Sequence, residues 1–218
     1  FNSKKVGKKS PQFFPHDRFS MANEVLNLFP TSVHLIDIEN YDVVKEEALS
    51  FIYQEQENNP SSVYKSNKGG WQSDSYYHQW DNIIKKIVDK GLSKHSEFYL
   101  DYKKLEYSAL WFNINKKGNY NYSHQHPRCD LSGVLWIKTP PNCGITAFES
   151  SHSYAASTYL DSINEEYRYH TRNYHDFMFN PLEGRMLIFP SYICHRVEPN
   201  ESDEDRISVS FNLSIVNR

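Results

Sequence analysis

The chain has 218 residues, which suits one large domain or two small ones. It carries 24 basic and 27 acidic residues, so no basic excess indicates a nucleic-acid partner, and no apolar run approaches the roughly 18 residues that cross a membrane. Aromatic residues make up 15 % of the chain, which argues against wholesale disorder.

The first twenty residues differ from the remainder of the chain. They contain four lysines and two prolines but no apolar stretch, which excludes a secretory signal. The chain begins with Phe1, and the sequence after Met21 is typical of the start of a domain. We therefore expect residues 1–20 to be an extension or leader and 21–218 to form a single domain.

The first half of that domain has mainly helical patterns. Alternating apolar residues predict a strand within 29–38, and apolar residues at helical spacing predict a helix over about 42–56. Residues 57–76 are rich in Asn, Pro, Ser and Gly and predict a loop. A second helix is expected over 77–98, with Trp80 on its apolar face.

The second half has strand-like patterns. Its predicted strands are Tyr107–Ile114, Gly133–Lys138, Gly144–Phe148, Phe177–Phe179, Arg185–Pro190 and Ile207–Val216. An insertion at 150–175, rich in Tyr and His, is expected to be either a lid over a site or a packed surface loop. Helices followed by many short strands favour an α+β fold with a sandwich or barrel.

The strongest local signal is the segment His124-Gln125-His126-Pro127. In an extended segment, residues i and i+2 project to the same side, so both imidazoles can reach one metal ion. The third ligand must come from another strand, and the best candidate is His195, which follows an apolar strand and a Pro-Ser pair. We therefore expect a metal site with open positions. With ten histidines in the chain, the alternative is a chance H-x-H pair.

A second signal lies 11 residues beyond His195. Arg206 and Ser208 share one face of an alternating strand. A guanidinium and a hydroxyl that point into a barrel suit a carboxylate, because Arg binds carboxylates through two parallel hydrogen bonds. The alternative is a surface salt bridge between Arg206 and the acidic run at 201–205.

These residues resemble the iron(II)- and 2-oxoglutarate-dependent dioxygenases, in which an H-x-D/E pair and a distal His hold iron. In that superfamily an Arg about ten residues further on, within R-x-S/T, binds the far carboxylate of 2-oxoglutarate. More narrowly, residues 111–212 resemble a family of predicted oxygenases from marine bacteria and their phages. The shared motifs are Trp111–Asn113, His124–Pro127, Ser132–Val134, Phe189–Ser191, His195 and Arg206–Asn212.

The resemblance implies a double-stranded β-helix, or jelly-roll, core with the N-terminal helices packed outside. It implies an iron(II)- and 2-oxoglutarate-dependent oxygenase, with ascorbate as reductant, that hydroxylates a peptide or a small molecule. Iron would bind His124, His126 and His195, and 2-oxoglutarate would contact Arg206 and Ser208. Asn113 is a further candidate contact of the cosubstrate. No catalytic residue is expected outside the metal site.

His126 departs from the superfamily, where most members have Asp or Glu. Three alternatives remain open: a three-histidine site, a site completed by Asp130 or Glu149, and a degenerate site that binds metal without catalysis. We favour three histidines. Such a site lacks one anionic ligand, so an anionic cosubstrate should bind at the metal more easily.

Two other functions fit the same residues. One is a cupin-like metal enzyme that does not use 2-oxoglutarate, and the other is a non-catalytic jelly-roll binding module. Three cysteines without a C-x-x-C favour a reducing compartment, so we expect the cytoplasm of a bacterium or of a phage-infected host. The sequence indicates neither nucleic-acid nor membrane partners, and it does not indicate an oligomeric state.

Overall fold

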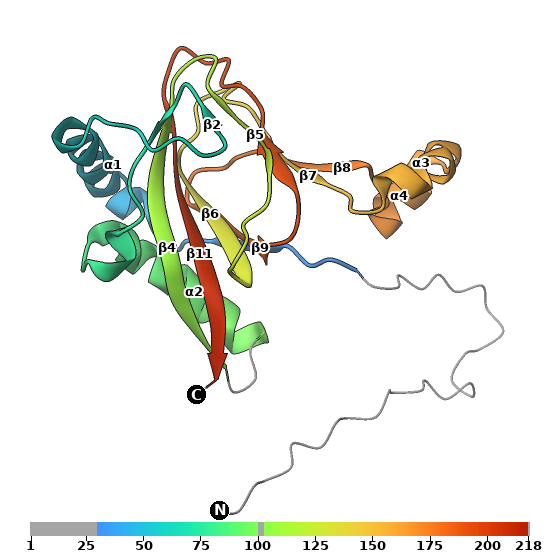
Figure 1. The fold of residues 1–218 in the computed structure, drawn as a ribbon, viewed down its shortest axis with the longest axis horizontal. Coiled ribbons are helices and arrows are strands. Elements are labelled where there is room, and N and C mark those ends of the chain that lie inside the picture. Colours follow the sequence, from blue (N-terminus) through green and yellow to red (C-terminus); the bar gives the residue numbers. More distant parts are fainter. Residues whose placement is uncertain (1–29, 100–102, 218) are drawn as a thin grey trace, which may run out of the picture. The chain divides into compact units, whose positions relative to one another are not determined.

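Two antiparallel sheets form the core of the computed structural model, which describes residues 30–99 and 103–217 (Figure 1). The larger sheet contains β1 (His34–Asp37), β9 (Arg185–Pro190), β6 (Leu131–Lys138), β11 (Arg206–Asn217), β4 (Lys103–Asn115) and β3 (Trp71–Gln72), in that order. The smaller sheet contains β2 (Asn67–Lys68), β5 (Tyr120–His124), β10 (His195–Val197), β7 (Thr146–Glu149) and β8 (Asp176–Phe179).

The order in which the chain visits the sheets defines the fold. From β4 onward the chain alternates between the two sheets. It forms β5 in the smaller sheet, β6 in the larger, β7 and β8 in the smaller, β9 in the larger, β10 in the smaller and β11 in the larger. This alternation between two antiparallel sheets is a jelly-roll, here a double-stranded β-helix. The expected α+β fold with this core is confirmed.

The larger sheet has an apolar face and a polar face, because alternate residues of a strand point to opposite sides. On the apolar face, Phe112 of β4 and Phe211 of β11 are fully buried in the main core. Helices α1 (Tyr41–Asn58) and α2 (Ile83–Tyr99) add residues such as Ile52 and Ile84 to this core. Each fully buried side chain of this kind contributes about 1.5–3 kcal/mol. The helices therefore cover the apolar face of the larger sheet, and its polar face borders the interior between the two sheets.

The first strand and the first helix are confirmed, but the second helix begins later than expected. It begins at Ile83, because the side chain of Asn82 accepts a hydrogen bond from the Lys85 backbone N–H at 2.8 Å and so caps the helix. Residues Tyr77–Gln79 form one 3₁₀ turn, and Trp80 is 48 % exposed rather than on the helix face.

Two segments expected to be irregular contain regular structure. The predicted loop at 57–76 holds β2 and β3, which pair with β5 and β4 from far along the chain. The insertion at 150–175 holds α3 (Ser153–Ser162) and α4 (Glu165–Thr171), at the end of the β7–β8 hairpin (Figure 1). Neither of the two expectations for this insertion foresaw helices.

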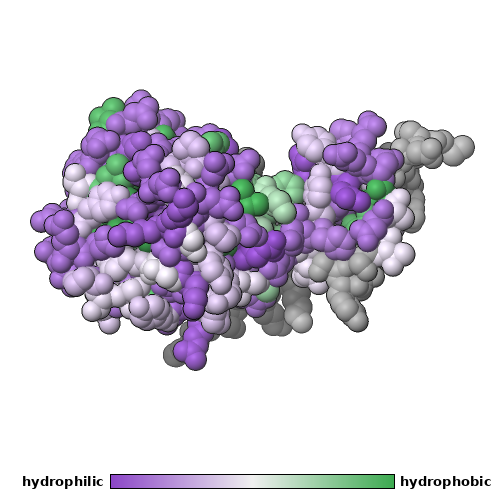
Figure 2. All heavy atoms as spheres, turned by 90° about the horizontal axis from the view of Figure 1, so that it is seen from above, coloured by the Kyte–Doolittle hydropathy of each residue, from purple (hydrophilic) through white to green (hydrophobic). Residues whose placement is uncertain are grey.

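The surface agrees with the polar composition. Figure 2 shows a face that is mostly hydrophilic, with small scattered hydrophobic areas. Within the described residues, no helix is both long enough and apolar enough to cross a membrane. The predicted boundary between 1–20 and 21–218 lies outside the described residues and stays a prediction.

Candidate metal centre

A cavity of about 520 Å³ lies between the two sheets and holds every residue that the sequence assigned to the site. His124, His126 and His195 line it together with the three candidate cosubstrate residues, Asn113, Arg206 and Ser208. Residues separated by up to 95 positions are therefore brought to one place.

The three histidines converge on one point. Their candidate ligand atoms all lie within 4.8 Å of one another, and Nε2 of His126 is 3.3 Å from Nε2 of His195. His124 ends β5 and lies opposite His195, the first residue of β10. The backbone N–H of His126 donates to the Ser191 carbonyl at 3.0 Å, which holds this residue beside the β9–β10 connection. The set has the spacing needed to share one metal ion.

A β-bulge sets the direction of His124. Along the β5–β10 pair, His124 lies opposite His195 but Asn121 lies opposite Val197, so the register shifts by one residue. Asn121 and His124 therefore both line the cavity, although strict alternation would place them on opposite faces. Sequence analysis did not predict this strand.

Backbone carbonyls orient two of the imidazoles. Nδ1 of His124 is 2.7 Å from the Tyr122 carbonyl oxygen, and Nδ1 of His195 is 3.1 Å from that of Ile193. A carbonyl only accepts hydrogen bonds, so each Nδ1 carries the proton and each Nε2 presents a lone pair. A carbonyl partner of this kind is the usual orienting contact of a metal-bound histidine.

The electrostatic environment favours neutral imidazoles. Burial, with a smaller contribution from His124, lowers the pKa of His126 to about 4. Burial and the neighbouring histidines lower the pKa of His195 to about 3, and burial also lowers the pKa of His124. Neutral imidazole is the form that binds metal ions.

The two carboxylates considered as alternative ligands are engaged elsewhere. Oδ2 of Asp130 accepts a hydrogen bond from the Ile215 backbone N–H at 2.7 Å. Oε1 of Glu149 is 3.3 Å from Nη1 of Arg196 in a surface ion pair. Neither residue lines the cavity, so the geometry favours the three histidines as the ligand set.

Arg206 is a buried cation with an unused donor group. It is 3 % exposed, and its Nη1 donates to the carbonyls of Cys143 at 2.6 Å and Glu198 at 3.1 Å. Its Nη2 is buried without a hydrogen-bond partner. Burial lowers the pKa of Arg206 to about 10, yet the group stays charged at neutral pH. The alternative of a salt bridge with 201–205 is wrong: among the ion pairs of the described residues, none involves Arg206.

Asn113 and Ser208 lie side by side on the cavity face of the larger sheet. They pair across β4 and β11, and Ser208 lies opposite Trp136 of β6. Nδ2 of Asn113 donates to Oγ of Ser210 at 3.1 Å. Trp136 is 2 % exposed and also lines the cavity, so it is both a buried core residue and part of the cavity wall.

Sequence analysis missed one wall of the cavity. Val63, Ser66, Gln72 and Asp74 line it from the segment before α2. Oγ of Ser66 lies 3.3 Å from Nε2 of His124. No local pattern indicates this wall, because it depends on pairing between β2 and β5.

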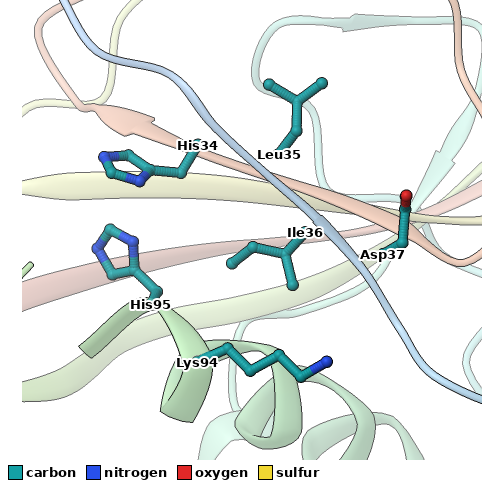
Figure 3. Close-up of a pocket in the computed structure, with 6 residues that line it drawn as sticks. All are labelled: His34, Leu35, Ile36, Asp37, Lys94 and His95. Carbon is teal, nitrogen blue, oxygen red and sulfur yellow. The ribbon is translucent and has the colours of Figure 1, made fainter. Parts of the chain in front are cut away.

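Other histidines lie away from this cavity. His152, His170 and His175 do not line it, and no described side chain of the 150–175 insertion does. His34 of β1 and His95 of α2 face each other in a separate shallow pocket (Figure 3), with ring centroids 4.6 Å apart and planes at 88°. In the part of the chain that the structure describes, the only cluster with metal-ligand spacing is His124, His126 and His195.

Residues 109–212 match the model of a family described as "Putative 2OG-Fe(II) oxygenase". The matched segment contains all three histidines, Asn113, Arg206 and Ser208. A comparison of the whole sequence with curated proteins found no match.

Solved structures share the fold at low sequence identity. A prolyl-4-hydroxylase from Pseudomonas putida is 14 % identical, with a TM-score of 0.54 over 86 % of this chain and 94 % of that one. HygX from Streptomyces hygroscopicus, solved with nickel, 2-oxoglutarate and hygromycin B, is 9 % identical, with a TM-score of 0.60 over 84 % and 83 %.

A third example is a prolyl hydroxylase from Trichoplax adhaerens in complex with a peptide fragment of the hypoxia inducible factor oxygen degradation domain. It is 10 % identical, with a TM-score of 0.57 over 84 % of this chain and 83 % of that one. At such identities the likeness establishes the fold. The family match over the segment that carries the site, together with this fold, points to an enzyme of the 2OG-Fe(II) oxygenase class.

Proposed function

We propose that the protein is an iron(II)- and 2-oxoglutarate-dependent oxygenase that hydroxylates a C–H bond of a peptide or small-molecule substrate. One observation carries this proposal. A single cavity holds three convergent imidazole nitrogens and a buried guanidinium whose Nη2 has no hydrogen-bond partner. The first feature suits a metal ion, and the second suits a carboxylate.

The residues fit iron(II) at the histidines. Each imidazole is neutral, and the Nδ1 protons of His124 and His195 are held by carbonyls, so Nε2 is free to act as the ligand atom. When bound, the metal supplies the oxygen chemistry. Three neutral ligands leave the metal charge uncompensated, which favours an anionic cosubstrate beside it.

The residues also fit 2-oxoglutarate. Nη2 of Arg206 would donate to the far carboxylate, which would compensate the buried charge. Ser208 lies two residues further along β11 on the same face and adds a hydroxyl donor, and Asn113 lies beside it on β4. The keto-acid end would then be available to a metal ion held by the histidines. A cupin-like enzyme without 2-oxoglutarate would leave Arg206 without an anion.

We propose a peptide or a small molecule as the substrate. Among proteins of this fold, the Trichoplax enzyme was solved with a peptide and HygX with hygromycin B. The wall formed by the segment 63–75 borders the histidines, and we assign the substrate to that wall. Ascorbate serves as reductant.

Binding of 2-oxoglutarate tests the proposal. Calorimetry with the Mn²⁺-loaded protein should show one 2-oxoglutarate site that is lost without metal. With Fe²⁺ and ascorbate, slow conversion of 2-oxoglutarate to succinate is expected. A metal-loaded protein that neither binds nor consumes 2-oxoglutarate would refute the function.

We also propose a narrower family and a cellular location. The order of the motifs from Trp111 to Asn212 supports membership in the marine bacterial and phage oxygenase family. All three cysteines are free, which supports a reducing compartment such as the cytoplasm. Fractionation of the native cells would test that location.

A further inference from the structure

Ser66 brings a hydroxyl group directly to the candidate metal site. Its Oγ lies 3.3 Å from Nε2 of His124, the atom that would bind the metal. Nδ2 of Asn121 donates a hydrogen bond to the same Oγ at 3.1 Å. The oxygen of Ser66 thus accepts one hydrogen bond, and its proton is available for donation to Nε2 of His124 when that atom carries no proton.

The backbone around Ser66 is firmly held. The Tyr122 backbone N–H donates to the Ser66 carbonyl at 2.9 Å, and β2 pairs with β5 at the next two residues. The buried side chain of Asn67 accepts from the Lys65 backbone N–H at 2.8 Å and donates to the Gly70 carbonyl at 3.2 Å. The position of the Ser66 hydroxyl is therefore set by the fold rather than by a free loop.

The lone pair on Nε2 of His124 can serve only one partner. Nδ1 carries the proton, because it faces the Tyr122 carbonyl at 2.7 Å. A metal ion at Nε2 takes the lone pair and leaves the Ser66 proton without that acceptor. The Asn121 amide already donates to the Ser66 oxygen, so the proton must turn to another acceptor at the metal.

We propose that Ser66 is a positioning residue that donates a hydrogen bond to the carboxylate of 2-oxoglutarate next to the metal. This inference rests on the proposed function. It gives the cosubstrate a donor at each end: Arg206 for the far carboxylate and Ser66 for the near one. It also links the substrate-side wall at 63–75 to occupancy of the cosubstrate site.

The test is calorimetry of 2-oxoglutarate binding to the Mn²⁺-loaded full chain. Ser66→Ala should weaken binding about tenfold, the loss expected for one hydrogen bond to a charged group. Affinity for Mn²⁺ alone should not change, and Ser66→Thr, which keeps the hydroxyl, should restore most of the loss. Ser61→Ala is the matched control, because Ser61 is exposed on the same segment and does not line the cavity.

Two outcomes would overturn the inference while leaving the proposed function intact. The first is equal affinity of wild type and Ser66→Ala for 2-oxoglutarate. The second is tighter Mn²⁺ binding by Ser66→Ala with unchanged 2-oxoglutarate binding, which would make Ser66 a competitor of the metal. If the wild-type protein fails to bind 2-oxoglutarate, the proposed function itself fails, and this inference with it.

Discussion

Replacing Arg206 with methionine is expected to remove most of the affinity for 2-oxoglutarate. Burial lowers the pKa of Arg206 from 12.5 to about 10, which corresponds to a cost of about 3 kcal/mol for keeping the buried group charged. A carboxylate on the unpartnered Nη2 would offset that cost. Because truncating one member of a buried charge pair costs about 2–5 kcal/mol, we expect binding to weaken at least about thirtyfold.

The assay is calorimetry of 2-oxoglutarate binding to the Mn²⁺-loaded protein. Methionine approximates the length of the arginine stem, so the cavity wall should be largely retained, and Mn²⁺ affinity should stay near the wild-type value. Arg196→Met is the matched control, because Arg196 forms surface ion pairs with Glu149 and Asp176 and does not line the cavity. An Arg206→Met variant that binds 2-oxoglutarate with wild-type affinity would refute the assignment of this residue.

Three further predictions concern the metal ligands, pH and a helix cap. His126→Ala should lower Mn²⁺ affinity at least about tenfold in calorimetry, whereas His126→Asp should retain binding, because a carboxylate can replace the imidazole. His95 is 2 % exposed, and burial, assisted by His34, lowers its pKa to about 4. The unfolded chain, with a His pKa near 6.5, binds the proton more readily, so this contribution to stability is present at pH 7 and is lost as the pH falls from about 6.5 toward 4. In urea unfolding, the stability lost between pH 7 and pH 5 should be about 2 kcal/mol smaller in His95→Leu. Asn82→Ala should lower the free energy of unfolding by about 1 kcal/mol, and Asn82→Asp should not, because Asp also caps helices.

Each of these has a contradicting result. Mn²⁺ affinity unchanged in His126→Ala would remove that residue from the ligand set. An identical pH dependence in His95→Leu and wild type would show that His95 is not held neutral by the fold. Equal stability of Asn82→Ala and wild type would mean that the hydrogen bond to the Lys85 backbone N–H does not stabilise α2.

Much of the site follows from local patterns. Alternation along β11 predicts that Arg206 and Ser208 share a face, and both line the cavity. The H-x-H pair and the distal His195 predict a cluster, and their ligand atoms lie within 4.8 Å. The two-residue period of an extended chain suffices for the Arg206–Ser208 pair and for the His124–His126 pair, whereas the addition of His195 rests on its place after a distant strand and on the family resemblance.

The exact bounds of the helices, by contrast, do not follow from the periodic pattern. The sequence between 77 and 98 has apolar residues at helical spacing, but the Asn82 cap decides where the helix begins. Two short helices form within 150–175, where the many aromatic residues hide the helical spacing. Asn164 caps the second of them by accepting a hydrogen bond from the Tyr167 backbone N–H at 2.8 Å. Caps are side-chain contacts of single residues and are easily missed beside a strong periodic signal.

By itself, the sequence determined the class of fold, the candidate metal ligands and the candidate carboxylate-binding arginine. Only the tertiary structure favours His126 over the carboxylate alternatives at the third ligand, because it engages Asp130 and Glu149 with partners far along the chain. Likewise, only the tertiary structure buried Arg206 without an ion-pair partner and placed Ser66 against His124. The physical reason is that side-chain direction is a local property of the backbone, whereas burial, register shifts and strand pairing depend on contacts between distant segments.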